Sequence, residues 1–194
     1  MKIKIINYLI NNISLFNFLK KILYWVKKKQ AHYICVSNVH SCIESFSNKS
    51  FKQAHNSADL ALADGRPIYW ALKLLGSKNA EHLPGYYVTD KICELANIKK
   101  IKIGFYGSTN ENLKKIKKNL KKKYKKLQIK YSFSPLFRKL KQIENKKIIT
   151  GINESKVDIL FVCLGCPKQE LWMYENKKKL KCTMIGIGAV ADFL

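Results

Sequence analysis

The chain has 194 residues, of which 47% are hydrophobic and 26% charged, a composition that is typical of one globular domain and excludes a disordered polypeptide. Its formal net charge is +24, and nearly all of it comes from lysine, because Arg66 and Arg138 are the only arginines. No stretch of roughly 18 or more uncharged apolar residues occurs, so a membrane-spanning helix is not expected. The charge reflects either a general enrichment in lysine or an anionic partner, such as lipid headgroups or a phosphate-rich substrate.

The first 29 residues mix apolar side chains with asparagine and lysine and end in Lys27-Lys28-Lys29. Their pattern predicts a basic amphipathic helix, and no small-residue cleavage site follows it, as a signal peptide would require. With Tyr24 and Trp25 near its basic end, such a helix fits an anionic membrane surface. A helix that packs into the core and leaves its basic end in solvent fits equally well. We therefore divide the chain into an N-terminal segment, residues 1–29, and a domain, residues 30–194.

From residue 31 onward, short apolar runs alternate with helical patterns. Strands are predicted at residues 31–37, 58–63, 101–106, 127–131, 157–164 and 183–187. Helices are predicted at residues 41–56, 67–75, 88–96, 143–153 and 167–180, together with a lysine-rich helix that ends near Lys123. This alternation predicts an α/β fold that is Rossmann-like, with a mostly parallel sheet and helices on both faces.

The six cysteines lie mostly in apolar runs, as free thiols do in a reducing compartment. Cys163 and Cys166 have the spacing of a redox or zinc pair, but a four-ligand zinc site needs a second such pair, which the sequence lacks. We expect no metal and no cofactor.

Four predicted strands end in polar loops, at residues 37–40, 64–66, 107–110 and 165–170. Because the carboxyl ends of parallel strands meet at one edge of a sheet, where ligands bind, these loops could converge on one site. Asp64 directly follows a buried strand, and Gly65 would let a substrate approach the backbone. Asp64 is therefore a candidate general base, although it could equally cap the helix that begins near Pro67.

The other polar residues each have two interpretations. Gly107 and Ser108 could hold a phosphate through backbone amides at a helix start, or they could form an ordinary turn. Gln169 could hydrogen-bond a ligand or be merely exposed. His40, taken alone, is more often structural than catalytic.

Taken together and in this order, the motifs from Cys35 to Leu194 resemble the bacterial WecG/TagA/CpsF glycosyltransferases, glycosyltransferase family 26. The matching blocks are Ser37-Asn38-Val39-His40; Ala58-Asp59 and Asp64-Gly65-Arg66-Pro67 with Trp70-Ala71-Leu72; Ser134-Pro135-Leu136-Phe137-Arg138; Leu164-Gly165-Cys166-Pro167-Lys168-Gln169-Glu170-Leu171-Trp172; and Ile185-Gly186-Ile187-Gly188-Ala189 with Asp192-Phe193. The Asp-Gly-x-Pro and Pro-Lys-Gln-Glu blocks are the most specific of these.

The resemblance implies an inverting transfer of a sugar, N-acetylmannosamine or a relative, from a UDP-sugar to a polyprenyl-diphosphate-linked sugar in teichoic acid or surface polysaccharide synthesis. It implies that Asp64 is the base and that Asn38 and Gln169 orient sugar or phosphate. The catalytic candidates are Asp64, Asn38 and His40. The expected substrate-binding residues are Ser37, Gly65, Arg66, His82, Gly107, Ser108, Gln169 and Asp192. The chain has no Asp-x-Asp motif, so a metal-independent mechanism is expected.

Three departures from the family pattern stand out. Ser37 replaces a threonine, and His82 replaces an arginine that handles diphosphate, with Tyr87 in place of a nearby acid. The chain also stops at Leu194, where relatives continue into a basic tail. A truncated or inactive relative is therefore one alternative, and a basic membrane- or nucleic-acid-binding module is another, although no nucleic-acid signature accompanies the lysines. We expect a cytoplasmic, peripheral position on the inner face of the membrane, with a homo-oligomer as an option.

Overall fold

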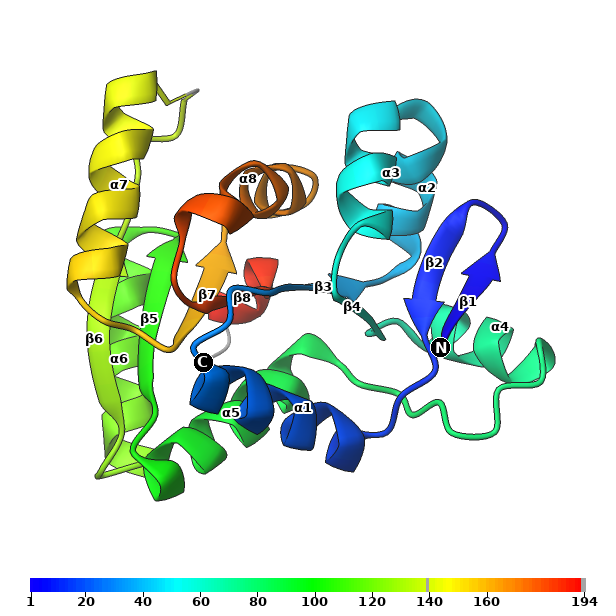
Figure 1. The fold of residues 1–194 in the computed structure, drawn as a ribbon, viewed down its shortest axis with the longest axis horizontal. Helices are drawn as coiled ribbons and strands as arrows, with labels where there is room; N and C mark the ends of the chain where they lie inside the picture. The colour runs from blue at the N-terminus through cyan, green and yellow to red at the C-terminus, as the bar shows by residue number, and fades with distance from the viewer. Residues whose placement is uncertain (139, 193–194) are drawn as a thin grey trace.

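The computed structural model describes residues 1–138 and 140–192. Its centre is a six-stranded parallel sheet with the order β4-β3-β8-β7-β5-β6 (Figure 1). The strands are β3 (Tyr33–Ser37), β4 (Leu60–Ala63), β5 (Lys102–Gly107), β6 (Gln128–Phe133), β7 (Ile159–Cys163) and β8 (Thr183–Gly186). The helices are α1 (Leu15–Lys28), α2 (Val39–Ser47), α3 (Lys49–Asn56), α4 (Arg66–Leu74), α5 (Gly85–Lys99), α6 (Asn110–Lys123), α7 (Gln142–Glu154) and α8 (Lys168–Asn176). The predicted α/β class with a parallel sheet is confirmed.

Helices cover both faces of the sheet, and each face has its own apolar core. On one face, α1, α5 and α6 pack against strand residues such as Leu62, Phe105 and Phe161. On the other face, α3, α7 and α8 pack against Cys35, Leu160 and their neighbours. The central strands β7 and β8 are buried along their whole length, because parallel strands covered on both sides present apolar residues to two cores.

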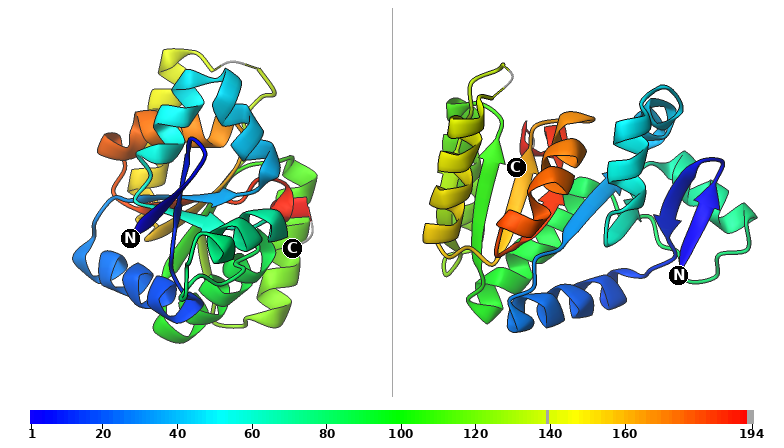
Figure 2. Two further views of the ribbon diagram at one scale, coloured as in Figure 1. Left: turned by 90° about the vertical axis from the view of Figure 1, so that its right-hand side faces the viewer. Right: turned by 45° about the horizontal axis from the view of Figure 1, so that its top comes forward.

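The N-terminal segment differs from its prediction as one helix. Strands β1 (Lys2–Ile5) and β2 (Tyr8–Asn11) form an antiparallel hairpin, and only Leu15–Lys28 is helical. The β1–β2 hairpin and α4 lie together at the end of the molecule opposite α7 and β6 (Figure 2). β2 lies against β4, where Asn11 Oδ1 accepts the Ala61 N–H at 2.8 Å. The hairpin thereby covers the outer side of an edge strand that would otherwise expose unpaired backbone groups.

Helix α1 is amphipathic, and its apolar face is packed into the protein. Phe18, Ile22 and Trp25 are buried in the same core as α5 and α6, whereas Lys27 and Lys28 are exposed at its end. The sequence allowed either a helix on a membrane surface or a helix packed into the core, and the apolar face of α1 is packed into the core. The functional division at residue 29 remains a prediction.

The helix predicted at residues 41–56 is divided into α2 and α3 at Asn48. Asn48 ends α2 and caps α3, with its Oδ1 accepting the Phe51 N–H at 2.9 Å. Asparagine favours such a position because its short side chain can replace a missing helical hydrogen bond. The remaining predicted elements agree with the structure to within three residues, apart from the last helical stretch, whose final turn, Lys177–Lys179, is a 3-10 helix.

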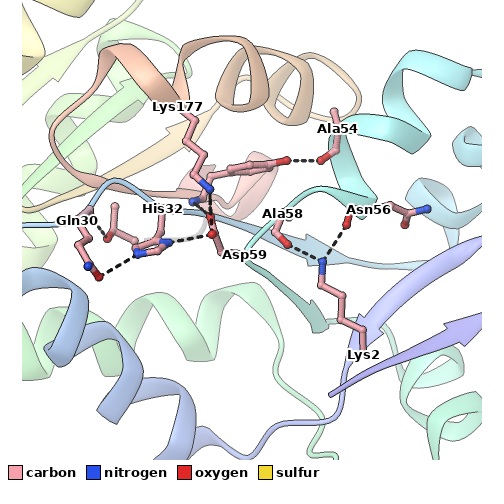
Figure 3. Close-up of polar contacts among 10 residues, drawn as sticks. Lys2, Gln30, His32, Ala54, Asn56, Ala58, Asp59 and Lys177 are labelled. Carbon is pink, nitrogen blue, oxygen red and sulfur yellow. Dashed lines mark hydrogen bonds and ion pairs between the residues drawn. The ribbon is translucent and has the colours of Figure 1, made fainter.

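A half-buried polar network lies at the amino ends of β3 and β4 (Figure 3). Asp59 lies at its centre, with His32 Nδ1 and Lys177 Nζ each 2.9 Å from the carboxylate and the Tyr33 N–H donating to it at 2.9 Å. Lys2 of the hairpin donates nearby to the carbonyl of Asn56 at 2.9 Å. The network joins β1, β3, β4 and α8 at one edge, so the opposite, carboxyl edge is left for ligands.

Over the residues that the structure describes, no helix combines the length and the hydropathy needed to cross a membrane.

Candidate active site

The predicted polar loops do share the carboxyl edge of the sheet. The loop after β3 carries Asn38, the loop after β4 carries Asp64, the loop after β5 carries Ser108, and the loop after β7 leads into Gln169. Because β3 and β4 are neighbours, the loops of Asn38 and Asp64 lie side by side.

Asp64 is held at the end of β4 by its backbone and by its side chain. Its N–H donates to the Ser37 carbonyl at 2.9 Å, which continues the pairing of β3 with β4. Its Oδ1 accepts the N–H of Gly85, the first residue of α5, at 2.7 Å. The carboxylate is partly exposed, and Gly65, not Asp64, occupies the cap position of α4. One oxygen is therefore anchored, whereas Oδ2 has no protein partner among the described residues and is available to accept a proton.

Asn38 caps α2 beside this carboxylate. Its Oδ1 accepts the Ser41 N–H at 3.1 Å, while Ser41 Oγ donates back to the Asn38 carbonyl at 2.8 Å. A Cβ at Gly65 would lie 3.4 Å from Asn38 Cβ, so the two loops are in contact. The capping bond uses only the oxygen of the amide, and within the described residues Nδ2 has no partner. Asn38 can therefore donate a hydrogen bond to a ligand next to Asp64.

Ser37 and His40 do not join Asn38 at the surface of the site. Ser37 is fully buried, and its Oγ hydrogen-bonds His55 Nε2 at 2.8 Å. His55 in turn stacks on Tyr8 of the hairpin, with ring centroids 3.7 Å apart. His40 is exposed on the first turn of α2, and no described residue hydrogen-bonds it. The Ser37 hydroxyl thus supports the loop from behind, and a direct role in binding or catalysis remains a prediction for both residues.

His82 lies beside the backbone of Asp64. The half-buried imidazole donates from Nε2 to the Asp64 carbonyl in a short hydrogen bond. Arg66 is exposed at the start of α4, so its guanidinium is free to meet an anion at this edge. The structure therefore gathers Asn38, Asp64, Gly65, Arg66 and His82 around the ends of β3 and β4.

Gly107 and Ser108 belong to a second cluster, at the ends of β5 and β7. Gly107 has φ +112°, and a Cβ there would lie 2.5 Å from the Cys163 carbonyl, so only glycine fits. Ser108 borders a cavity of about 350 Å³ between β7, α8 and the loop after β6. Tyr106, Leu136, Phe137 and Trp172 form its apolar walls, and Arg138 and Lys168 place cationic groups at it. Sequence reasoning missed this cavity, although the Ser134–Arg138 and Pro167–Trp172 blocks contain six of its lining residues.

Gln169 is 4% exposed and both ends of its amide are engaged inside the protein. Nε2 donates to Glu170 Oε1 at 2.9 Å, and Oε1 accepts the Gly188 N–H at 2.9 Å. Glu170, which the sequence analysis did not select, is 1% exposed. Burial raises the pKa of Glu170 to about 7, although the hydrogen bond from Gln169 opposes this shift. Sequence reasoning could have found Glu170 from its place in the Pro-Lys-Gln-Glu block.

The predicted substrate-binding residue Asp192 ends the 3-10 turn Gly188–Asp192, and its side chain lies outside the described part of the structure. Among the side chains that the structure describes, no three of His, Cys, Asp or Glu form a group suited to a metal ion. The peptide bond between Cys166 and Pro167, in the loop that leads to Gln169, is cis.

An open parallel sheet with polar loops gathered at its carboxyl edge defines an α/β enzyme fold that binds its ligands at that edge. The chain belongs to the glycosyl transferase WecG/TagA/CpsF family, whose model matches residues 3–194. It is 24% identical over 157 residues to an N-acetylglucosaminyldiphosphoundecaprenol N-acetyl-beta-D-mannosaminyltransferase of Staphylococcus aureus (strain NCTC 8325 / PS 47), covering 80% of this chain and 60% of the relative. It is 22% identical over 169 residues to the protein of the same description in Bacillus spizizenii (strain ATCC 23059 / NRRL B-14472 / W23), covering 87% and 64%. The chain thus spans under two thirds of the length of these relatives.

Proposed function

We propose that this chain catalyses transfer of an N-acetylmannosamine-like sugar from a UDP-sugar to a polyprenyl-diphosphate-linked N-acetylglucosamine. An acceptor hydroxyl oxygen attacks the anomeric carbon of the donor and forms the new glycosidic bond. The bond from that carbon to the diphosphate breaks, and the nucleotide diphosphate leaves with the electron pair. Asp64 takes the proton of the hydroxyl, and the configuration at the anomeric carbon is inverted.

The observation that carries this proposal is the environment of Asp64. A general base must present an unshared oxygen where a substrate can reach it. The Gly85 N–H fixes one oxygen of Asp64 at 2.7 Å, and the other has no partner among the described residues. Preorganisation of this kind aligns the base before the substrate arrives, which lowers the barrier for proton transfer.

The length of the donor matches the distance between the two clusters, the one around Asp64 and the one around Ser108. Adjacent strands lie about 4.8 Å apart, so the loops after β4 and β7, which β3 and β8 separate, start roughly 14 Å apart. This span is comparable to that of an extended nucleoside diphosphate sugar. The nucleobase would occupy the cavity beside Trp172, with Lys168 and the backbone near Ser108 facing the diphosphate, and the sugar would reach Asp64.

The lipid part of the acceptor would lie against α2 and α4, the two helices that begin next to the proposed catalytic base, Asp64. Val39 and Ile43 of α2 and Trp70 and Leu74 of α4 are exposed, and both helices begin at the loops of Asn38 and Asp64. With a net charge of +24, the protein would be attracted to anionic headgroups, and these apolar side chains would then contact the acyl region. This arrangement supports peripheral membrane binding, which the proposal places at the cytoplasmic face.

The experiment that tests this function measures product formation from a panel of UDP-sugars with polyprenyl-diphosphate-N-acetylglucosamine in vesicles. We expect one N-acetylhexosamine donor to react, faster on anionic than on neutral vesicles, and more slowly as salt is added. Absence of glycosylated lipid with every donor on both vesicle types would contradict the proposal. Equal rates on both vesicle types would contradict only its membrane part.

A further inference from the structure

The most deeply buried carboxyl group near the site is Glu170. It lies in the first turn of α8, the helix that leaves the carboxyl end of β7, and 1% of it is exposed. Its Oε1 accepts from Gln169 Nε2 at 2.9 Å, whereas Oε2 has no hydrogen-bond partner among the described residues. Because a buried carboxyl group without full hydrogen bonding is costly, its presence here needs a reason.

Gln169 connects this carboxyl group to the turn after β8. Its Oε1 accepts the Gly188 N–H at 2.9 Å, at the first residue of the turn Gly188–Asp192. A Cβ at Gly186 would lie 3.1 Å from the Gln169 amide, so the end of β8 packs directly on this side chain. The amide therefore links α8 to the end of β8.

The same turn reaches the candidate base. Val190 packs on the start of α5, where a Cβ at Gly85 would lie 2.8 Å from Val190 Cγ2. The Gly85 N–H is the group that anchors Asp64 Oδ1 at 2.7 Å. Contacts therefore run without interruption from Glu170 through Gln169, the turn and Gly85 to Asp64.

We propose that Glu170 is a positioning residue, which orients the Gln169 amide and thereby holds the Gly188–Asp192 turn and Gly85 in place behind Asp64. An amide can rotate by half a turn and exchange its oxygen and nitrogen. With Glu170 as acceptor on one side and the Gly188 N–H as donor on the other, only one orientation satisfies both groups. The effect of Glu170 on turnover rests on the proposed function, whereas its effect on the turn does not.

The protonation state of Glu170 gives this proposal a second measurable consequence, a pH dependence of donor binding. The titratable groups that face it are the Cys166 thiol, Glu44 of α2, Cys35 of β3 and Tyr8 of β2, and none of them is a cation. Burial raises the pKa of Glu170 to about 7, and Glu44 raises it further. The neutral form still offers an oxygen to Gln169, but above pH 7 the ionised form adds a negative charge close to the proposed diphosphate site. Binding of an anionic donor should therefore weaken as Glu170 ionises.

Two substitutions in the full chain test the proposal, with Glu154→Gln and Glu154→Leu on the exposed end of α7 as matched controls. Glu170→Leu removes the acceptor, so we expect the Gly188 amide to exchange with solvent at least tenfold faster by NMR and kcat to fall. Glu170→Gln keeps an acceptor oxygen but cannot ionise. It should preserve the protection of the Gly188 amide and abolish the rise in donor KM between pH 6 and 8 that the wild type shows.

Unchanged Gly188 exchange in Glu170→Leu would overturn the proposal, as would a KM profile in Glu170→Gln that still rises above pH 7. If Glu170→Leu does not fold, the exchange rate and pH profile of Glu170→Gln decide. If no form of the protein turns over, yet Gly188 exchange responds as expected, the proposed function fails while Glu170 still positions the turn. If the wild type turns over and exchange does not respond, only the positioning role fails.

Discussion

At the scale of single residues, backbone geometry at the ends of strands decides which side chains reach the site. Gly107 is the sharpest case, because its φ of +112° turns the chain directly against Cys163. Ser108 follows in a left-handed conformation, with its N–H donating to the Cys163 carbonyl at 2.9 Å. This turn aims the loop after β5 at the cavity beside Trp172.

Gly107→Ala should therefore destabilise the protein by on the order of 3 kcal/mol, because the new Cβ adds a backbone overlap to the conformational strain. Gly76→Ala is the matched control, since Gly76 also has positive φ (+80°) but a Cβ there meets nothing within 4 Å. It should cost about 1 kcal/mol. Urea unfolding measures both values, and equal losses would show that contact with Cys163 is unimportant.

The residue scale also shows where sequence reasoning about the site ends. The position of Asp64 after a strand and the match of Asn38 to the family motif predict both residues at the site, and the structure places them in contacting loops. For Ser37 and Gln169 the same reasoning could not show burial, because their partners, His55 and Gly188, come from distant segments. The role of Gly85 as the anchor of Asp64 was invisible for the same reason.

At the scale of elements, local patterns predicted the strands of the sheet well, because each is a short apolar run between turn residues. They failed at the N-terminus, where apolar residues alternate at positions 3, 5, 8 and 10 and pair as a hairpin. The stabilising contacts of that hairpin, such as Asn11 with Ala61, span about fifty residues and leave no local signal. The division at Asn48 followed from capping rather than from hydrophobic periodicity.

Helix α1 provides the prediction at this scale. Ile22→Ala removes a fully buried side chain from the core shared with α5 and α6, so the free energy of unfolding should fall by about 2–5 kcal/mol. Phe16→Ala, on the exposed side of the same helix at 73% exposure, should change it by less than about 0.5 kcal/mol. Similar small effects of both substitutions on chemical denaturation would show that α1 does not pack into the core in solution.

At the scale of the whole molecule, the buried His55 and the half-buried Asp59 couple stability to pH in one direction, and the buried Glu170 couples it in the other. Burial lowers the pKa of His55 to about 3, below its value near 6.5 in an unfolded chain. Burial alone would raise the pKa of Asp59, but hydrogen bonds from His32, Lys177 and the Tyr33 N–H lower it. In both cases the unfolded state binds more protons in acid, so stability present at neutral pH is lost as the pH falls.

His55 should therefore lower the free energy of unfolding from about pH 6.5 downward, by up to about 1.4 kcal/mol per pH unit, until its folded pKa near 3. Glu170, whose folded pKa of about 7 lies above its unfolded value, opposes this loss between about pH 7 and 4.5, so the net decrease is expected below about pH 4.5. Asp59 adds to the loss only below its unfolded pKa of about 4. Urea unfolding at pH 7, 6, 5 and 4 measures the profile. His55→Gln should leave the Glu170 contribution alone, so that the free energy of unfolding rises as the pH falls from 7 to 5, whereas the exposed His40→Gln should leave the wild-type profile unchanged. An unaltered profile in His55→Gln would exclude a contribution from His55.

The central claim is that the carboxylate at the end of β4 is the base of a sugar transfer, and Asp64→Asn tests it most directly. The amide keeps an oxygen for the Gly85 N–H but cannot take a proton, so UDP affinity should stay within about threefold of the wild type while turnover falls about 10²–10⁴-fold. Asp90→Asn on α5 serves as the control. Transfer by Asp64→Asn at the wild-type rate, with UDP still bound, would contradict the assignment of the base.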